Sequence, residues 1–587
     1  MILLQNQSPE NTVMRIALAL LLSLFVSTTK ANQKIDFELK DIHGKTVNFQ
    51  TEFSDNKAVV VTFIGTECPL VKLYSSRLNK FASQYRSKSI EFIAISSNQQ
   101  DTIEELKAFA RSQKINFPIL KDPGNEVADQ FNASRTPEVF VLNDEFEVVY
   151  QGTIDDQYTY GIQQSQPKNN YLLDVLNAIG DSQPIAISKT EAVGCIIGRK
   201  LKEQKNSPVT FHDQISRIFQ KKCIRCHREG ELAPFSLSDY DEVAGWAGMI
   251  EEVVKDRRMP PWHADAKNGV FKNDARLNEE EKKLIFDWVA AGAPAGDIAK
   301  APKKLNFAKG WQIGRPDKII KMRYRPFKVP ATGVVEYKHF LVDPKFQEDK
   351  WIKAAECRPG NRSVVHHIIV GVRGEGEFGG HESDALQSEW IAATAPGAPP
   401  MILPDGYAKF VPAGSKLIFQ MHYTPNGTAQ EDLSEIGFVF AEPQSIKKQV
   451  MTLMTYNPKI RIPAGEENYR TTSRFTFDQD MELLSMFPHM HYRGKKFRYE
   501  FKLPGHSYQT WLNVPNYDFN WQNAYELSEY RQIPRGTKLR CVAHFDNSDK
   551  NLANPNPDRT VSWGDQTWDE MMIGYFDVAV DVDSSQP

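Results

Sequence analysis

The hydrophobic pattern of the chain changes twice, and this predicts three modules of different architecture. Residues 33 to about 180 alternate strand-like apolar runs with helix-like segments, as in an α/β domain. Residues 208–298 read as short helices, typical of an all-α domain. From Trp311 onward, short β-like runs recur between turns that contain Pro and Gly. The expected fold class is therefore multidomain: an α/β domain, an all-α domain and two antiparallel β-sandwiches.

Particular runs support these expectations. Residues 58–64 are almost entirely apolar, as in a buried central strand, and residues 90–95 form a second such run. Residues 102–113 predict a helix with one apolar face, and residues 279–291 predict another, which Gly292 ends. Further strand-like runs lie at residues 139–142, 148–150, 334–337, 364–372, 416–423, 436–440, 538–545 and 571–580.

Composition narrows the classes of function. The 587 residues suffice for three or four domains. The formal net charge of -3 gives no indication of a nucleic-acid partner. Six cysteines are too few for a disulfide framework in a chain of this length, and two of them share one Cys-x-x-Cys pair.

The N-terminus predicts an export signal. Arg15 precedes the apolar run of residues 16–26, and a plausible cleavage site follows Ala31. An uncleaved membrane anchor is the other interpretation, but the run is short for a transmembrane span. The start of translation is either Met1 or Met14. We expect a periplasmic or secreted protein with no stable membrane span after cleavage.

A Cys-x-x-Cys-His motif, Cys223-Ile224-Arg225-Cys226-His227, lies in the helical region. Two thiols at this spacing can add to the vinyl groups of haem, and the histidine that follows can bind the iron. A zinc half-site would need a second pair of ligands nearby. A redox dithiol would be expected at a strand-to-helix turn. The motif therefore favours one covalently bound haem c, held by Cys223, Cys226 and His227.

A second axial ligand is available in Met259, which two prolines and a tryptophan follow. This segment, with residues 271–274 and 288–294, resembles the class I cytochrome c domain. Histidine and methionine ligation would leave no open position for oxygen on the iron. We therefore expect the haem to transfer electrons.

Five histidines of the β-rich part fall into three groups. His489 and His491 are separated by one residue, so on a strand both side chains would face the same way. His366 and His367 are adjacent and could reach one metal only where the backbone bends. His422 stands alone. Taken singly, each of these residues is more often a core or surface histidine than a metal ligand.

The order of these groups resembles the copper type II, ascorbate-dependent monooxygenases, the family of peptidylglycine α-hydroxylating monooxygenase and dopamine β-monooxygenase. The resemblance runs from Trp311 to the C-terminus and rests on four segments. These are Val364-Val365-His366-His367-Ile368, Gln420-Met421-His422-Tyr423, His489-Met490-His491-Tyr492 and Asp569-Glu570-Met571.

The resemblance implies two copper ions. One would be bound by His366, His367 and His422, and the other, where O2 reacts, by His489, His491 and Met571. A thioether favours Cu(I), the state that binds O2. The implied reaction hydroxylates an activated C–H bond, with Tyr575 also at the catalytic site.

The substrate of the peptide enzyme does not carry over. Its substrate-anchoring arginine is replaced by Phe487, and its asparagine after the copper methionine is replaced by Ile573. A less polar small molecule is therefore expected as substrate. A family disulfide is also lost, because Met572 replaces the partner of Cys541.

The N-terminal α/β region carries Gly65-Thr66-Glu67-Cys68-Pro69 after its first apolar run, and Thr136-Pro137 before a later strand. It resembles the redoxin (peroxiredoxin/thioredoxin-like) family, with Cys68 as its catalytic thiol. Val71 stands where thioredoxins have a second cysteine, and Thr66 is one residue closer to the cysteine than in peroxiredoxins. Cys195 is a candidate resolving partner. A domain kept only for docking, with Cys68 inert, remains an alternative.

These expectations combine into one organisation: a signal peptide at 1–31, a redoxin domain at 32–185, a linker with Cys195 at 186–207, a cytochrome c domain at 208–298, a linker at 299–310, and copper-binding sandwiches at 311–448 and 449–587. The expected function is a copper monooxygenase that takes electrons from a periplasmic donor through its own haem and acts on a small molecule with O2. The alternative is a non-oxygenating protein that handles copper or relays electrons.

Overall fold

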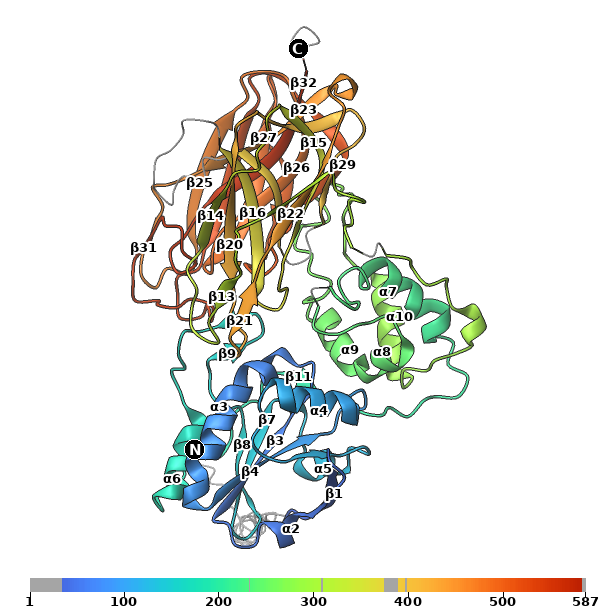
Figure 1. Ribbon diagram of the computed structural model, residues 1–587, viewed down its shortest axis with the longest axis vertical. Helices are drawn as coiled ribbons and strands as arrows, with labels where there is room; N and C mark the ends of the chain where they lie inside the picture. Colours follow the sequence, from blue (N-terminus) through green and yellow to red (C-terminus); the bar gives the residue numbers. More distant parts are fainter. Residues whose placement is uncertain (1–33, 232, 308–309, 374–388, 396–398, 583–587) are drawn as a thin grey trace, which may run out of the picture.

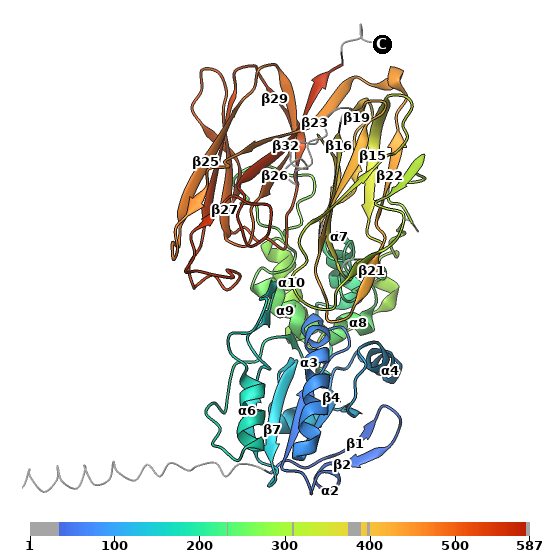
Figure 2. The same cartoon turned by 60° about the vertical axis from the view of Figure 1, so that its left-hand side comes forward.

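The computed structural model describes residues 34–231, 233–307, 310–373, 389–395 and 399–582 (Figure 1). The expected signal peptide at 1–31 lies outside this range. Figure 2 shows the two sandwiches side by side, with the helical module and the α/β domain toward the other end of the molecule. Among the described residues, no helix combines the length and apolar character needed to cross a membrane.

The α/β domain is built on a seven-stranded sheet with the order β2-β1-β5-β4-β3-β7-β8. Strand β3 (Ala58–Phe63) is entirely buried and lies between parallel β4 (Ile90–Ser96) and antiparallel β7 (Glu138–Asn143). The long helix α3 (Pro69–Tyr85) starts directly after Cys68. Helix α4 (Ile103–Ser112) begins at a capping box in which Thr102 and Glu105 satisfy each other's backbone amides. The other elements are β1 (Glu38–Asp41), β2 (Thr46–Asn48), β5 (Ile119–Lys121), β8 (Val148–Gly152), α5 (Glu126–Phe131) and α6 (Tyr171–Gly180).

The segment predicted as a linker at 186–207 is held to this domain. Its strand β11 (Cys195–Ile196) pairs with β6 (Arg135–Thr136). A two-residue strand is too short to show an alternating hydrophobic pattern, so the sequence predicted only a linker here. Its position brings Cys195 next to the Thr136-Pro137 loop.

The helical module contains α7 (Ser216–Lys222), α8 (Tyr240–Gly245), α9 (Ala247–Lys255) and α10 (Glu279–Ala290). Helix α10 starts at a capping box of Asn278 and Glu281. Its Trp288 is fully buried and donates a hydrogen bond from Nε1 to the carbonyl oxygen of Pro294, 3.1 Å away. A buried indole that also satisfies its N–H is a strong anchor for a small helical core.

The β-rich part forms two sandwiches that share one nine-stranded sheet. Parallel pairing of β19 (Tyr407–Val411) with β23 (Lys448–Tyr456) joins the halves of this sheet. A four-stranded sheet, β14-β20-β16-β17, belongs to the first sandwich. Another, in the order β25 (Tyr469–Thr476), β30, β27 (Gly494–Lys502) and β28 (Gln509–Val514), belongs to the second. The strands that position the sites are β14 (Lys338–Val342), β16 (Val365–Arg373), β17 (Glu389–Thr394), β20 (Lys416–Tyr423), β26 (Met481–His489), β29 (Tyr525–Ile533), β30 (Lys538–Phe545) and β32 (Ile573–Asp581).

Two predicted strands are displaced. Residues 334–337 are not a strand, and β14 starts at Lys338 instead, because only from there does the chain pair with β20. The predicted run 571–580 starts as strand at Ile573. Met571 therefore precedes β32, so the alternation of side chains between the two faces of a sheet does not set the direction of its side chain.

Candidate functional site

Three imidazoles from β16 and β20 converge in the first sandwich. His366 Nδ1 lies 3.4 Å from His367 Nδ1 and 3.2 Å from His422 Nδ1. The pairing of β16 with β20 shifts register between Val365 and His367, and His367 lies opposite His422. This bulge supplies the backbone bend that two adjacent histidines need in order to face one point.

The surroundings of these rings suit a metal ion. Burial lowers the pKa of His366 to about 4 and the pKa of His367 and His422 well below the usual value. The rings are therefore neutral, with lone pairs free for coordination. A proton on one Nδ1 can satisfy only one neighbour, whereas a cation can satisfy all three. The three ring nitrogens lie within 4.8 Å of one another, which is compact enough for one ion.

A second pair of imidazoles lies at the end of β26 in the second sandwich. The rings of His489 and His491 are 5.2 Å apart and nearly perpendicular. Strand β26 ends at His489, so His491 lies just beyond the strand. The backbone then leaves the sheet: the amide of Met490 donates to Tyr517 Oη, and the amide of His491 donates to Glu570 Oε2.

Hydrogen bonds leave one nitrogen of each ring available. His489 Nδ1 lies 2.7 Å from Gln522 Oε1, and His491 Nδ1 lies 3.3 Å from the carbonyl oxygen of Asp569. Both acceptors favour a proton on Nδ1, so Nε2 carries the lone pair. His491 Nε2 is buried and has no hydrogen-bond partner, as expected for an atom that a metal would satisfy.

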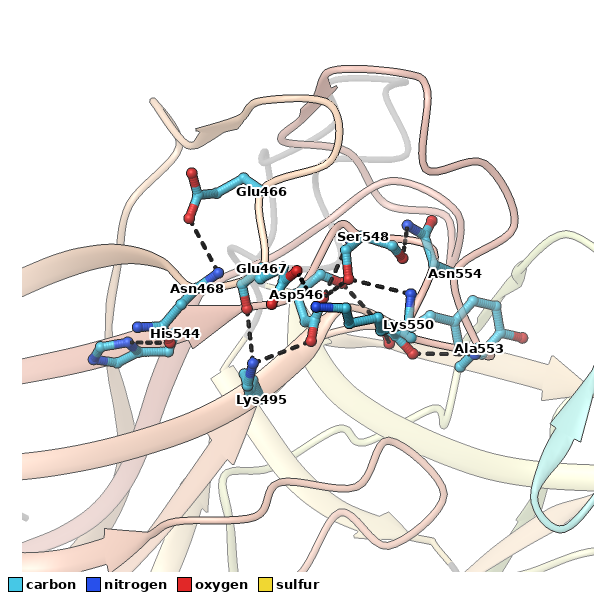
Figure 3. A network of polar contacts seen from close by, with 12 residues as sticks. Glu466, Glu467, Asn468, Lys495, His544, Asp546, Ser548, Lys550, Ala553 and Asn554 are labelled. Carbon is cyan, nitrogen blue, oxygen red and sulfur yellow. Dashed lines mark hydrogen bonds and ion pairs between the residues drawn. The ribbon is translucent and has the colours of Figure 1, made fainter. Parts of the chain in front are cut away.

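Polar contacts fix the chain that follows His491 (Figure 3). Lys495 Nζ donates to the carbonyl oxygen of Glu467 at 2.7 Å and pairs with Asp546 at 3.1 Å. The amide of Asp546 donates to the carbonyl oxygen of Arg493. This network ties the His491 turn to the segment after β30. It stiffens the support of the second imidazole pair.

Met571 lies at a cavity next to this pair. The cavity has a volume of about 20 Å³ and is lined by His489, Met571, Tyr575 and Trp390, among others. Met490 and Met572 are instead fully buried in the core of the second sandwich. The structure thus brings Met571 and Tyr575 to His489, and packs the other two methionines away from this cavity.

Two aromatic residues at these sites carried no signal in the sequence. The Tyr337 ring lies 5.4 Å from His367 and 4.9 Å from His422, and its buried hydroxyl has no hydrogen-bond partner. Phe519 stacks on His366 at 5.8 Å and lies 6.1 Å from His491. A single ring is therefore in contact with both imidazole groups. Lone aromatics in loops look like ordinary core residues, so only the tertiary structure identifies them.

The Cys-x-x-Cys-His motif follows α7, with Cys223 at the helix C-cap. His227 Nδ1 lies 3.2 Å from the carbonyl oxygen of Phe235, which favours Nε2 as the free ligand atom. Burial lowers the pKa of His227 to about 4, so the ring is neutral. Met259 lies in the turn after α9, where its amide donates to the carbonyl oxygen of Val253. Its role as axial ligand stays a prediction.

The helical module reaches both imidazole groups. A cavity of about 80 Å³ is lined by Cys226 of the motif and by His366, and Arg362 pairs with Glu231 nearby at 3.3 Å. On the other side, residues 261–273 pack on the second sandwich, where Asn523 Nδ2 donates to the carbonyl oxygen of Pro261. The motif is therefore a neighbour of His366, whereas the segment after Met259 contacts the second sandwich.

In the α/β domain, Cys68 is the N-cap residue of α3 and is fully buried. Its Sγ lies 2.9 Å from the carbonyl oxygen of Thr136. Burial raises the pKa of the Cys68 thiol, but hydrogen bonds from Cys195 and from the amide of Val71 outweigh this and lower it to about 6. Thr66 donates to Asp101 Oδ1 at 2.8 Å, so its hydroxyl is committed there.

Comparison with known proteins identifies the N-terminal part of the chain. The model of the AhpC/TSA family matches residues 31–157. The thiol-disulfide oxidoreductase ResA of Halalkalibacterium halodurans is 26% identical over 117 residues, which are 20% of this chain and 64% of that protein. ResA of Bacillus subtilis is 29% identical over 126 residues, 21% of this chain and 66% of the relative.

The chain thus spans slightly less than two thirds of the length of these two relatives. Peroxiredoxin Q of Sedum lineare is 28% identical over 128 residues, 21% of this chain and 67% of that protein. A hypothetical protein, SMc02350, of Sinorhizobium meliloti has a solved structure with 29% identity. It covers 30% of this chain and 96% of its own, with a TM-score of 0.26. The chain therefore carries a redoxin/thioredoxin-like domain near its N-terminus, which supports a redox role for this part.

Proposed function

We propose that this chain is an exported, copper-dependent monooxygenase that receives electrons through a covalently bound c-type haem. The observation that carries the proposal is the convergence of His366, His367 and His422. The Nδ1 atom of His366 lies 3.4 Å from that of His367 and 3.2 Å from that of His422. Apolar side chains would stabilise the core better than three neutral imidazoles packed this closely, so the cluster indicates a metal site rather than a structural role.

The second group supports two coppers with different roles. His489 and His491 each present Nε2, and Met571 offers a thioether at the same cavity as His489. Nitrogen and thioether donors suit copper better than zinc or magnesium. When bound, the two copper ions would hold the electrons that arrive through the haem and would provide the centre at which O2 is reduced.

The residues of the chain prepare that centre for an apolar substrate. The Trp390 ring is tilted against Tyr575, with ring centroids 4.1 Å apart, and Phe487 stacks on Tyr575 at 5.9 Å. These rings belong to one hydrophobic cluster with Met571. We infer a small organic substrate, for which this aromatic-lined cavity of about 20 Å³ would have to widen, because that volume holds about one water molecule.

Electron supply follows from the position of the helical module. Cys226 would carry one edge of the haem, and it lines the same cavity as His366. This arrangement favours delivery to the cluster of His366, His367 and His422 first. The Phe519 ring, which contacts both His366 and His491, then lies between the two imidazole groups.

The alternative is a copper-handling or electron-relay protein that does not use O2. Copper stoichiometry and oxygen uptake separate the two. We expect two coppers per chain in the reduced, haem-loaded protein, and O2 consumption that depends on an added small apolar substrate. A single tightly held Cu(I), with no substrate-dependent uptake across a broad panel of small molecules, would favour the alternative.

A further inference from the structure

We propose that Cys68 and Cys195 form one thiol–disulfide exchange site, in which Cys195 replaces the second cysteine that the Cys68 motif lacks. The two residues are 127 positions apart, and no sequence spacing connects them. Strand pairing does: Cys195 of β11 is the partner of Thr136 in β6, and the carbonyl oxygen of Thr136 lies 2.9 Å from Cys68 Sγ. The inference concerns the redoxin domain and is independent of copper or haem.

The approach of the β11 segment depends on a glycine. A Cβ atom at Gly194 would lie 2.1 Å from the carbonyl oxygen of Thr136, far inside contact distance with backbone. Tyr160 Oη donates to the carbonyl oxygen of Gly194 at 2.5 Å and holds the segment in place. Because Gly194 has no side chain, the segment with Cys195 can lie against the Thr136 backbone next to Cys68.

The two thiols have unequal character. The hydrogen bond between them stabilises negative charge on Cys68, while the same bond raises the pKa of Cys195 well above its usual value. Cys68 also lies at the N-terminus of α3, where the helix dipole favours a thiolate. Cys68 is therefore the attacking sulfur and Cys195 the resolving one.

The helical module covers this pair. Cys68 is fully buried and Cys195 is 9% exposed, and both share a hydrophobic core with Trp246 and Ile250 of that module. Arg135 of β6 pairs with Glu252 of α9 at 2.7 Å. Glu252 also pairs with Arg258, whose guanidinium lies 4.3 Å from the Tyr160 ring centroid. A partner molecule reaches the thiols only when this contact opens.

The reaction balances with a small disulfide as oxidant. The Cys68 thiolate attacks one sulfur of the disulfide R–S–S–R, forms a mixed disulfide and releases one R–S⁻. The Cys195 thiol then gives its proton to the released R–S⁻ and attacks Cys68 Sγ, which releases the second R–S⁻ and closes the Cys68–Cys195 bond. Two electrons and the Cys195 proton pass from the protein to the disulfide, the second R–S⁻ takes its proton from water, and a dithiol reverses both steps.

The test uses the full chain with oxidised glutathione as probe, followed by acid quench, differential alkylation and peptide mapping. The wild type should yield a Cys68–Cys195 linked peptide that dithiothreitol removes. Cys195→Ser should instead accumulate glutathione on Cys68, and Cys68→Ser should accumulate none on Cys195. Cys357→Ser, at a buried cysteine of the first sandwich, is the matched control and should behave as the wild type.

The same assay tests whether the helical module must move away from Cys68 and Cys195 before they react. Glu252→Gln weakens both ion pairs and should speed formation of the linked peptide several-fold, whereas Glu251→Gln on the same helix should not. The proposal is overturned if the wild type retains glutathione on Cys68 without forming the linked peptide. It is overturned equally if neither cysteine reacts in the Glu252→Gln protein.

Discussion

Asn523 of the second sandwich donates a hydrogen bond from Nδ2 to the carbonyl oxygen of Pro261, 2.9 Å away, two residues beyond Met259. The preceding residue, Gln522, accepts at Oε1 from His489 Nδ1 at 2.7 Å. Two adjacent side chains therefore contact the helical module and a candidate copper ligand. Docking of the module and orientation of His489 depend on the same short loop.

Gln522→Ala should weaken metal binding by the second imidazole pair. The variant removes the acceptor that fixes the Nδ1–H tautomer of His489, and loss of such a partner typically costs about 10- to 100-fold in metal affinity. Competition with a Cu(I) chelator measures the effect. Gln532→Ala, at an exposed glutamine of β29, is the control. Equal affinity in all three proteins would show that His489 needs no such orientation.

His422→Ala should remove one of the two coppers. The variant leaves half-buried His366 and buried His367 without the third donor, so binding at that cluster should fall below detection. Metal analysis after gel filtration should give about one copper per chain in place of two. His544→Ala is the matched control, because His544 lies at the surface beside Asn468 (Figure 3). Retention of both coppers in His422→Ala would contradict the assignment.

Met571→His should keep much of the copper and lose O2-dependent turnover. An imidazole replaces the thioether, so His489 and His491 still bind, but Cu(I) is less favoured there. X-ray absorption of the reduced protein should lose its sulfur scattering. Persistent scattering would mean that another sulfur is the ligand. Met490 and Met572 would be next, although both are buried in the core of the second sandwich.

Covalent haem should survive acid–acetone extraction of protein matured with a cytochrome c assembly system. Cys223→Ala combined with Cys226→Ala should lose the haem in the same extraction. Met259→Ala should keep the haem but lower its reduction potential, since a methionine ligand raises the potential. An unchanged potential in Met259→Ala would exclude Met259 as the axial ligand.

Reaction of Cys68 with iodoacetamide should follow a pH profile with a midpoint near 6, where its pKa lies. Below this pH the thiol is protonated and slow; above it the thiolate dominates and the rate levels off. The groups that face Cys68 are Cys195 and, through Cys195, the guanidinium groups of Arg135 and Arg258. Cys195→Ser should move the midpoint upward. A wild-type midpoint near the usual cysteine value would contradict the thiol pair.

Much of the fold could be read from local pattern. The apolar run at 58–64 became the buried strand β3, and the helix predicted at 279–291 became α10, capped by Asn278. These predictions succeeded because period and capping are local properties of the chain. The run at 334–337 failed, since a strand needs a pairing partner and β20 offers one only from Lys338 onward.

The sequence by itself determined which chemistry is available: a Cys-x-x-Cys-His motif, five histidines in three groups, and one cysteine at a strand-to-helix turn. Only the tertiary structure decided which residues meet. A bulge in β16 turns His366 and His367 toward His422, and β11 carries Cys195 to Cys68 across 127 residues. Phe519 contacts two imidazole groups, and Asn523 contacts the helical module, because the loop before β29 packs against both the first sandwich and that module. Such contacts depend on the packing of distant segments, which hydrophobic period and residue spacing do not encode.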